Sequence, residues 1–303
     1  MKLYAPKYYN SFKCIADKCT HSCCIGWEID IDEKTLEKYT SFEDGYGLKI
    51  KQSIDLDEAP HFRLGADERC PHLNGKGLCS IITELGENYL CDICREHPRF
   101  YNDTVRGKEV GLGMACEEAA RIILTSDEYN QFAEIGAVDK EAEDFDFDSV
   151  AERERIYTAL LDRSNPYPER LESLFSEYNV SPRILDDDEW LNVIGSLEYL
   201  DEKHKTRFLN YSSDVTVPPM LEPMIERALA YFIFRHCSDS FDEAEFRARL
   251  GFCMFCERLL ASVLMSENAF ELREIIRYAR IISEEIEYSE DNMEKLMVEF
   301  YIV

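Results

Sequence analysis

The second half of the chain repeats apolar residues at the spacing of amphipathic helices. The segment Ser240-Phe-Asp-Glu243 has the form of a capping box, and apolar side chains then recur at helical spacing: Phe246, Leu250, Cys253, Met254, Leu260 and Leu264. Ser266 is a candidate N-cap for a second stripe: Leu272, Ile275, Ile276, Ala279 and Ile286. Pro218-Pro219 opens a further helix through Ile225, Leu229 and Phe232, because proline is favoured in a first turn.

Further helical segments near residues 150–163, 168–178 and 186–205 complete a predicted bundle. The chain from Leu3 to about Arg121 has a different texture, because Gly, Pro, Asn and Asp interrupt its short apolar stretches. That pattern predicts loops, short helices and a small hairpin, organised around something other than a large core. The acids that open Glu117-Glu118-Ala-Ala-Arg121 place Cys116 at or just before a helix start.

Residues 126–149 separate these two regions. The segment Glu141-Ala-Glu-Asp-Phe-Asp-Phe-Asp148 alternates acids with aromatics and has no helical stripe, as expected of a solvated linker or an edge segment. We therefore predict a mainly α protein. It should have an irregular, cysteine-rich, metal-organised domain over 1–125, an acidic linker over 126–149 and an acidic helical domain over 150–303. No βαβ alternation is visible, so no wide parallel sheet is expected.

Composition supports a folded, soluble protein. Of the 303 residues 45% are hydrophobic, and 17 Tyr and 17 Phe supply core-forming aromatics. The best candidate for a membrane span, Ala228 to Phe234, lies between Arg227 and Arg235 and is far shorter than the roughly 18 residues needed. The first residues lack the apolar stretch of a signal peptide. A cytoplasmic location is therefore expected.

The net charge of −27 is concentrated in the second region. Residues 1–120 carry 15 Lys and Arg against 21 Asp and Glu, whereas residues 121–303 carry 19 against 40. Such a field repels nucleic-acid phosphates and anionic lipid, so neither is an expected partner. It would attract a lysine-bearing protein surface, although solubility alone also explains the acidity.

Nine of the twelve cysteines lie in the first 116 residues: Cys14, Cys19, Cys23, Cys24, Cys70, Cys79, Cys91, Cys94 and Cys116. They could form disulfides, serve as inert buried thiols, or hold a metal. Disulfide frameworks are typical of short secreted chains, and inert thiols would occur singly on apolar stripes. Local groups such as Cys91-x-x-Cys94 therefore favour a metal.

We take as candidate ligands the first eight of these residues: Cys14, Cys19, Cys23, Cys24, Cys70, Cys79, Cys91 and Cys94. Zinc takes four ligands in a closed site, and a [4Fe–4S] cluster also takes up to four thiolates. Eight exceed the need of one centre, so there are two centres or some thiols have other roles. The common radical S-adenosylmethionine motif is absent, because Gly26 stands where Cys19-x3-Cys23 would need a third cysteine.

Other polar residues near the cysteines have two readings. His72 and His97 could join a mixed metal site, but hydrogen-bonded structural roles are favoured. Arg95 and Arg99 could lower thiolate pKa values or form surface ion pairs. Cys253-Met-Phe-Cys256 and Cys237 lie in apolar helical stretches and are predicted to be core thiols. Signatures of phosphate-binding loops, serine hydrolases and zinc proteases are absent.

The order of the cysteine motifs resembles the flagellin lysine-N-methylase family. The resemblance is carried by Cys-x4-Cys-x3-Cys-Cys-x-Gly-Trp from Cys14, Cys70-Pro-His-Leu, Leu78-Cys79-Ser-Ile, Leu90-Cys91-x-x-Cys94-Arg-x-x-Pro-Arg99 and Ala115-Cys116-Glu-Glu-Ala-Ala-Arg121. It covers roughly residues 14–121, and Glu117 stands where proline would be expected. This family is related to a broader group of proteins with a cysteine domain assigned to zinc or iron chelation.

The resemblance implies an S-adenosylmethionine-dependent methyltransferase that modifies lysine side chains of flagellin and carries a [4Fe–4S] cluster in its cysteine-rich region. Zinc is the alternative metal. The alternative function is a non-enzymatic zinc- or iron-chelating protein that handles metal, and a third possibility is a zinc-stapled interaction protein. The sequence identifies no catalytic residue and no methyl-donor pocket, and it assigns no role to Cys116.

Overall fold

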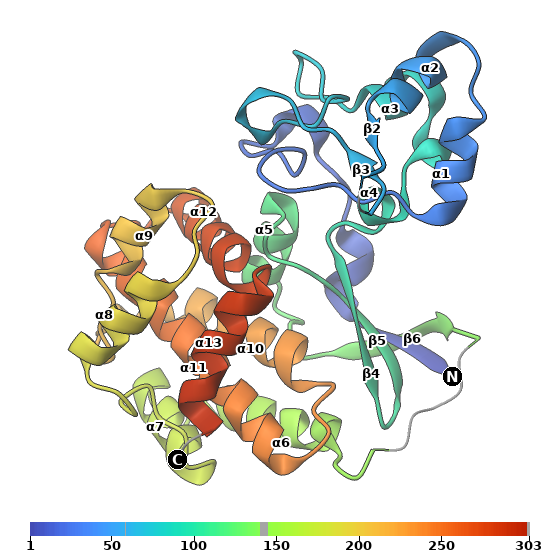
Figure 1. Cartoon of the computed structure of the whole chain (residues 1–303). Coiled ribbons are helices and arrows are strands. Elements are labelled where there is room, and N and C mark those ends of the chain that lie inside the picture. Colours follow the sequence, from blue (N-terminus) through green and yellow to red (C-terminus); the bar gives the residue numbers. More distant parts are fainter. Residues whose placement is uncertain (58, 140–144, 302–303) are drawn as a thin grey trace. The chain divides into compact units, whose positions relative to one another are not determined.

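The computed structural model describes residues 1–57, 59–139 and 145–301, and its elements are labelled in Figure 1. The chain forms two compact units. The smaller unit spans Lys13–Arg99, and the larger unit combines Met1–Phe12 with the chain from Phe100 onward. We expected the domain boundaries at residues 125 and 150. The observed division is different, because the first strand and the segment after Phe100 belong to the same unit as the helices.

Helices make up most of the larger unit, so the prediction of a mainly α protein is confirmed. They are α5 (Glu117–Thr125), α6 (Ser149–Leu161), α7 (Tyr167–Glu177), α8 (Asp187–Ser196), α9 (Glu202–Phe208), α10 (Glu222–Cys237), α11 (Glu243–Ser266), α12 (Leu272–Ile282) and α13 (Glu290–Tyr301), with a π-helical turn η5 (Ser283–Glu287) and a 3₁₀ turn η1 (Lys7–Ser11). None of the described helices has both the length and the apolar character to cross a bilayer.

Several helix boundaries differ from the predicted ones. Ser266 ends α11, and Glu271 caps α12 in its place. Helix α10 begins at Glu222, after Pro218-Pro219. Helix α11 is capped by Asp242, whose carboxylate accepts from the Glu245 amide at 2.8 Å, whereas the Ser240 hydroxyl donates to the Cys237 carbonyl. The helix expected over 186–205 is broken into α8 and α9. Between them, the backbone N–H groups of residues 198, 200 and 201 donate to the side chains of Asn292 and Glu285 instead of continuing a helix.

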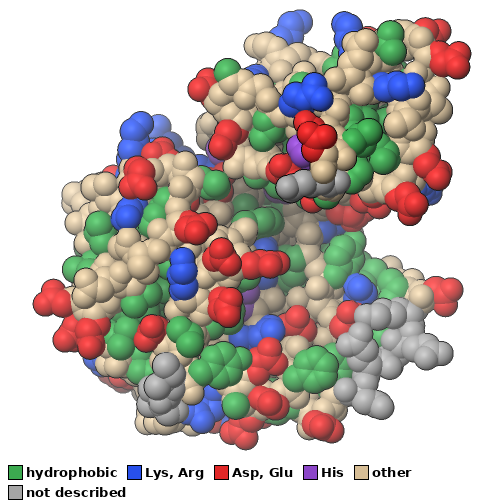
Figure 2. Space-filling view, viewed as in Figure 1, with side chains coloured by type: hydrophobic (Ala, Val, Ile, Leu, Met, Phe, Trp, Pro, Cys, Tyr) green, Lys and Arg blue, Asp and Glu red, His purple; other side chains and the backbone are tan. Residues whose placement is uncertain are grey.

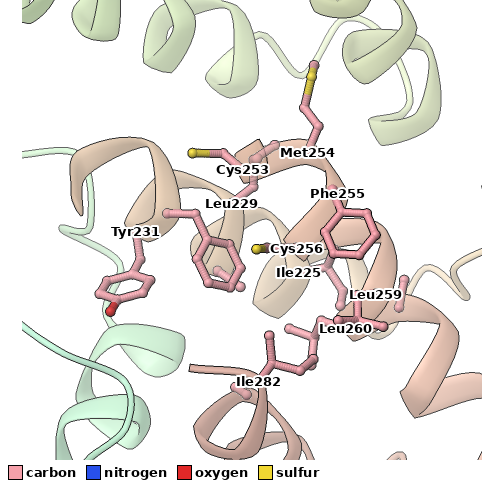
Figure 3. Packing of buried hydrophobic residues seen from close by; sticks show 14 of the residues in the cluster. Ile225, Leu229, Tyr231, Cys253, Met254, Phe255, Cys256, Leu259, Leu260 and Ile282 are labelled. Carbon is pink, nitrogen blue, oxygen red and sulfur yellow. The ribbon is translucent and has the colours of Figure 1, made fainter. Parts of the chain in front are cut away.

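The core of the larger unit lies between α10 and α11 and the helices packed on them (Figure 3). Trp190 is fully buried and its ring centroid lies 4.8 Å from that of Phe255. Cys253 and Cys256 are also fully buried among apolar side chains, which confirms their prediction as core thiols. Each large apolar side chain buried in this way contributes about 1.5–3 kcal/mol.

A four-stranded mixed sheet belongs to the same unit, with the order β4 (Arg99–Thr104), β5 (Gly107–Leu112), β1 (Lys2–Pro6) and β6 (Phe132–Ala137). Strand β1 pairs in parallel with β5, where Leu3 lies opposite Lys108, and antiparallel with β6. Gly107 has φ 141°, and a Cβ there would lie 2.6 Å from the Lys2 carbonyl oxygen, so glycine is required. Strand β6 occupies part of the segment that we expected to be a linker.

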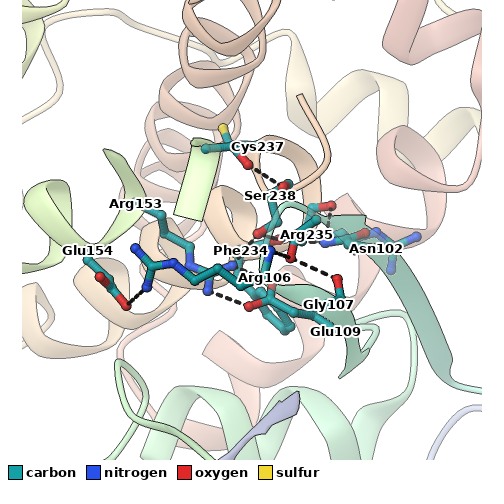
Figure 4. A network of polar contacts seen from close by, with 12 residues as sticks. Asn102, Arg106, Gly107, Glu109, Arg153, Glu154, Phe234, Arg235, Cys237 and Ser238 are labelled. Atoms are coloured by element: carbon teal, nitrogen blue, oxygen red, sulfur yellow. Dashed lines mark hydrogen bonds and ion pairs between the residues drawn. The ribbon is translucent and has the colours of Figure 1, made fainter. Parts of the chain in front are cut away.

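A buried ion pair joins this sheet to the helices (Figure 4). The Arg153 guanidinium of α6 donates to both carboxylate oxygens of Glu109 on β5, at 2.6 and 2.7 Å, and also to the Ser238 hydroxyl. Both charged side chains are almost fully buried. The bidentate geometry compensates each charge locally, which a buried charge requires.

The smaller unit is irregular, as predicted. Its elements are short: α1 (Glu33–Thr40), α2 (Gly45–Gln52), β2 (Ile54–Asp55), β3 (His61–Phe62), α3 (Ser80–Leu85) and α4 (Asp92–Glu96), with 3₁₀ turns η2 (Ala16–Lys18), η3 (Ala66–Glu68) and η4 (Glu87–Tyr89). It has a separate small core of Ile29, Ile31, Tyr39, Ile50, Ile54, Phe62, Cys70, Leu73, Ile81 and Cys91. Two of these ten residues are cysteines, so thiols take part in the packing of this unit.

Candidate functional site

Five of the predicted ligands meet in the core of the smaller unit. Cys70 and Cys91 are buried there, and three half-buried cysteines, Cys24, Cys79 and Cys94, pack against the same cluster. We call these five residues the thiol core. All twelve cysteines lie in the described part of the chain, and all of them are free thiols there.

Backbone hydrogen bonds bring the first three thiol-bearing segments together. The Cys70 amide donates to the Cys24 carbonyl at 2.9 Å. Cys79 lies opposite Leu73 in an isolated antiparallel bridge. Between Cys70 and Cys79 the chain reverses at Asn74, whose side-chain oxygen accepts from the amides of residues 76 and 78. The predicted turn at Asn74-Gly75 is therefore confirmed, and it places two distant cysteines in one cluster.

Cys91 and Cys94 come from the start of α4. Cys91 is the residue before the first helical turn, and its carbonyl accepts from the Arg95 amide at 3.0 Å. A hydrogen bond between the two thiols lowers the pKa of Cys91 below its ordinary value. The same hydrogen bond, together with burial, raises the pKa of Cys94. One thiolate of this pair is therefore favoured, and a second would need a compensating cation.

Burial and neighbouring thiols also shift the pKa values of the other three cysteines. Hydrogen bonds from Cys23 and Ser22 lower the pKa of Cys24 to about 7 although burial opposes the change. Burial raises the pKa of Cys70 to about 12 and also raises the pKa of Cys79, and the charge of Cys24 adds to both increases. Several thiolates cannot persist so close together without a positive centre, which is the condition that a metal ion or cluster meets.

The remaining three predicted ligands lie outside the thiol core. Cys14 and Cys23 are exposed, and Cys19 is half-buried at the end of η2. The Trp27 indole donates to the Cys23 carbonyl at 2.7 Å, which fixes the backbone beside Cys24. The structure thus gathers five of the eight candidates in one apolar cluster, to which Cys14, Cys19 and Cys23 do not belong.

The donor set of the thiol core fits a soft metal centre. Its side chains are all sulfur, the ligand type of zinc and of iron–sulfur clusters. Within residues 1–57, 59–139 and 145–301, no group of three or more His, Cys, Asp or Glu side chains is arranged to hold a single metal ion. The thiol core thus supplies the sulfur donors that both kinds of centre use, and its thiols are not arranged around a single ion in this structure.

His72 has a structural role. Its Nδ1 lies 2.9 Å from the Tyr46 hydroxyl and its Nε2 lies 2.9 Å from the Ser53 hydroxyl. Burial lowers the pKa of His72 to about 4, so the ring is neutral near pH 7. Because both ring nitrogens are hydrogen-bonded, neither is available to a metal, and the structural reading is confirmed.

The other flanking residues have local contacts of their own. The His97 ring lies beside that of Trp27, with centroids 6.0 Å apart. The Arg95 guanidinium forms an ion pair with the Asp92 carboxylate, which favours its surface-pair reading. Cys116 directly precedes α5 and its carbonyl accepts from the Ala120 amide at 2.8 Å, so its predicted place at a helix start is confirmed.

The larger unit contains a cavity that the sequence did not reveal. Its volume is about 620 Å³, and β4, the end of α10, α11, η5 and α13 contribute its lining: Phe100, Asn102, Arg235, His236, Asp239, Arg249, Glu287, Glu290, Met293, Glu294, Met297, Val298 and Tyr301. The buried Glu287 carboxylate lies 2.6 Å from His236 Nε2 and 3.4 Å from the Arg235 guanidinium. Its lining residues on α13 recur three or four positions apart in the sequence, which is also the spacing of an ordinary solvated helix face.

Known proteins resemble part of the chain. Over 126 residues, 39% of this chain, it is 29% identical to the flagellar biosynthetic protein FliU of Salmonella muenchen, and the match covers 75% of FliU. The same identity over the same length relates it to the lysine-N-methylases of Salmonella typhimurium and Salmonella choleraesuis. The match spans only 31% of each of these two proteins. No family model and no solved structure matches the chain.

Proposed function

We propose that this chain, which is related to the flagellin lysine-N-methylase family, is an S-adenosylmethionine-dependent protein-lysine N-methyltransferase that acts on flagellin. The observation that carries the proposal is the match to two lysine-N-methylases and to FliU. The acidity of the helical region supports a lysine-rich substrate, since residues 121–303 carry 19 basic against 40 acidic side chains. Figure 2 shows acidic side chains spread over the visible face of these helices.

The thiol core is the proposed site of a [4Fe–4S] cluster. Four of Cys24, Cys70, Cys79, Cys91 and Cys94 would hold it, and the charge of the irons would compensate the thiolates. When bound, such a cluster ties distant loops together and can offer an open iron to a substrate or cofactor group. The mutual influence of the five thiols on one another's pKa supports their assignment to one centre.

Methyl transfer requires little of the protein beyond positioning of the methyl donor and the lysine amine. A carbon–nitrogen bond forms between the lysine amine and the methyl group, while the carbon–sulfur bond of S-adenosylmethionine breaks and S-adenosylhomocysteine leaves. The lysine ammonium must first lose a proton, because only the neutral amine has the lone pair that attacks. An acidic side chain or a water molecule can accept that proton, and alignment of the two reacting atoms supplies much of the rate.

Methyl transfer to purified flagellin tests the proposal. We expect cluster-loaded protein to transfer label from S-adenosylmethionine to flagellin lysines. A variant with Cys91→Ala and Cys94→Ala should lose this activity. A variant with Cys253→Ala and Cys256→Ala, which removes the same motif from the larger core, should retain it while the protein stays folded. Absence of label with the cluster-loaded wild-type protein would overturn the proposal.

A metal-handling protein is the second candidate, and the exposed thiols favour it. Cys14 and Cys23 are exposed, so they could pass a metal to an acceptor. In that case the loaded protein would release iron or zinc readily to an acceptor protein and would leave flagellin unlabelled. Retention of metal in the presence of the acceptor, combined with methyl transfer, would exclude this candidate.

A further inference from the structure

The cavity of the larger unit has negative charge that its own residues do not neutralise. Asp239 pairs with Arg249 at 2.6 Å, and Glu287 pairs with Arg235 and His236. These contacts compensate the charges of Asp239 and Glu287. Two further lining carboxylates, Glu290 and Glu294, are exposed and form no ion pair with any described residue. The cavity therefore presents two uncompensated negative charges.

Helix α13 places these two carboxylates next to an apolar surface. The residues of this helix that line the cavity are Glu290, Met293, Glu294, Met297, Val298 and Tyr301. Their spacing of three and four positions puts them on one helix face. Val298 is 44% exposed and Tyr301 is 52% exposed, so the apolar part of this face is open to a partner.

The two glutamates also repel each other. Like charges four residues apart on a helix destabilise it slightly, and a bound cation would relieve the repulsion. The two methionines beside them can adapt their side chains to different partners. On the face shown in Figure 2, acidic and hydrophobic side chains lie side by side over the region of α13. These properties call for a ligand with a positive charge next to apolar groups.

We propose that this cavity docks a lysine-bearing segment of the protein substrate. The lysine ammonium lies against Glu290 and Glu294, and apolar side chains beside that lysine cover Met297, Val298 and Tyr301. A volume of about 620 Å³ lies within the range of roughly 300–1,000 Å³ that is common for binding pockets. The identity of the partner as the methylated protein rests on the proposed function, whereas the preference for a cationic side chain rests on the cavity alone.

Binding of three labelled peptides tests the proposal directly. The probes are a ten-residue peptide with one lysine between leucines and the same peptide with norleucine or glutamate in place of lysine. We expect the lysine peptide to bind wild-type protein about tenfold more tightly than the norleucine peptide at low salt, because two carboxylates face its charge. This preference should shrink at high ionic strength.

Charge reversal provides the matched variant. Glu290→Lys with Glu294→Lys should abolish the lysine preference and make the glutamate peptide the tightest ligand of the three. Glu202→Lys changes an exposed acid at the first position of α9 and should leave all three affinities as in wild type. Circular dichroism of both variants checks that the helices remain folded. Equal binding of the lysine and norleucine peptides, or an unchanged order in the double variant, would overturn the proposal.

Enzyme kinetics separate this inference from the proposed function. If wild-type protein methylates flagellin and the double variant does so with the same KM, the docking proposal is wrong and the methyltransferase stands. If the peptide preference and its reversal are observed but no methyl transfer occurs, the docking site stands and the proposed activity is wrong. A raised KM with little change in kcat is the expected result, because docking contributes equally to binding of the substrate and of the transition state.

Discussion

The same motif, two cysteines separated by two residues, occurs in both units and has opposite surroundings. Cys253 and Cys256 lie inside a 24-residue helix and are fully buried among apolar side chains. Burial raises both of their pKa values far above the ordinary value, so these thiols stay neutral. Cys91 and Cys94 lie at the start of a five-residue helix beside three other thiols. Spacing alone therefore does not identify a metal site, and the surroundings decide the role.

The two units also differ in the interactions that can stabilise each of them internally. The larger unit has a continuous apolar core with several fully buried aromatic side chains. The smaller unit has short helices, two-residue strands and a core of ten residues that includes two cysteines. We propose that a bound centre adds to the stability of this unit by tying its short elements together.

The largest expected effect comes from removing matched cysteine pairs. Cys91→Ala with Cys94→Ala should abolish metal binding and lose the hydrogen-exchange protection of residues 13–99, because folding of a metal-organised domain is coupled to its metal. Cys253→Ala with Cys256→Ala should lower the stability of the larger unit by about 1–2 kcal/mol for each side chain and leave the metal content unchanged. Loss of metal in the second variant would show that Cys253 and Cys256 also affect metal binding, so that the two motifs do not differ in this role.

A smaller effect should follow from breaking the buried ion pair of the larger unit. Glu109→Gln leaves the Arg153 guanidinium buried without its counter-charge. We expect the free energy of unfolding of this unit to fall by about 3–5 kcal/mol, with no change in metal content. Urea denaturation followed by tryptophan fluorescence measures the change, since Trp190 is buried in this unit. An unchanged unfolding midpoint would show that the pair contributes no net stability.

The pH dependence of the larger unit should be the mildest of these effects. Burial works against ionisation of Glu226, but hydrogen bonds from Arg163 and Tyr129, with the charge of Arg170, hold its pKa below the ordinary 4.5. Its contribution to stability is therefore complete above pH 4.5 and is lost as the pH falls through the folded-state pKa. Thermal unfolding between pH 7 and pH 3 should show a shallower pH dependence for Glu226→Gln than for wild type. Identical slopes would exclude Glu226 as a contributor.

The sequence predicted those features that depend on neighbouring residues. Helices α10, α11 and α12 follow apolar stripes, and the core position of Cys253 follows from its apolar neighbours. The break between α8 and α9 could not be predicted, because Glu285 and Asn292 reach it from the far end of the chain. Strand β6 is mostly exposed and has no apolar alternation, and its pairing with β1 joins distant segments.

The candidate site shows the same limit. Clustering along the sequence identified eight cysteines, but only the fold shows that five of them share one core. Cys24 and Cys70 lie far apart in the sequence. A backbone hydrogen bond between them, which no local sequence pattern predicts, brings them together. Glu290 and Glu294 would be read as an ordinary solvated helix face in the sequence. Their role as cavity residues depends on β4 and α10, which lie far away along the chain.

Metal analysis of the purified protein shows whether the thiol core holds a metal centre. Protein purified without oxygen should contain about four iron and four sulfide per chain, as expected for one [4Fe–4S] cluster. Hydrogen exchange on the same sample should show protection in residues 13–99 that disappears when the iron is removed, while the larger unit stays protected. Metal-free protein in which both units are fully protected would show that the smaller unit folds without a metal centre.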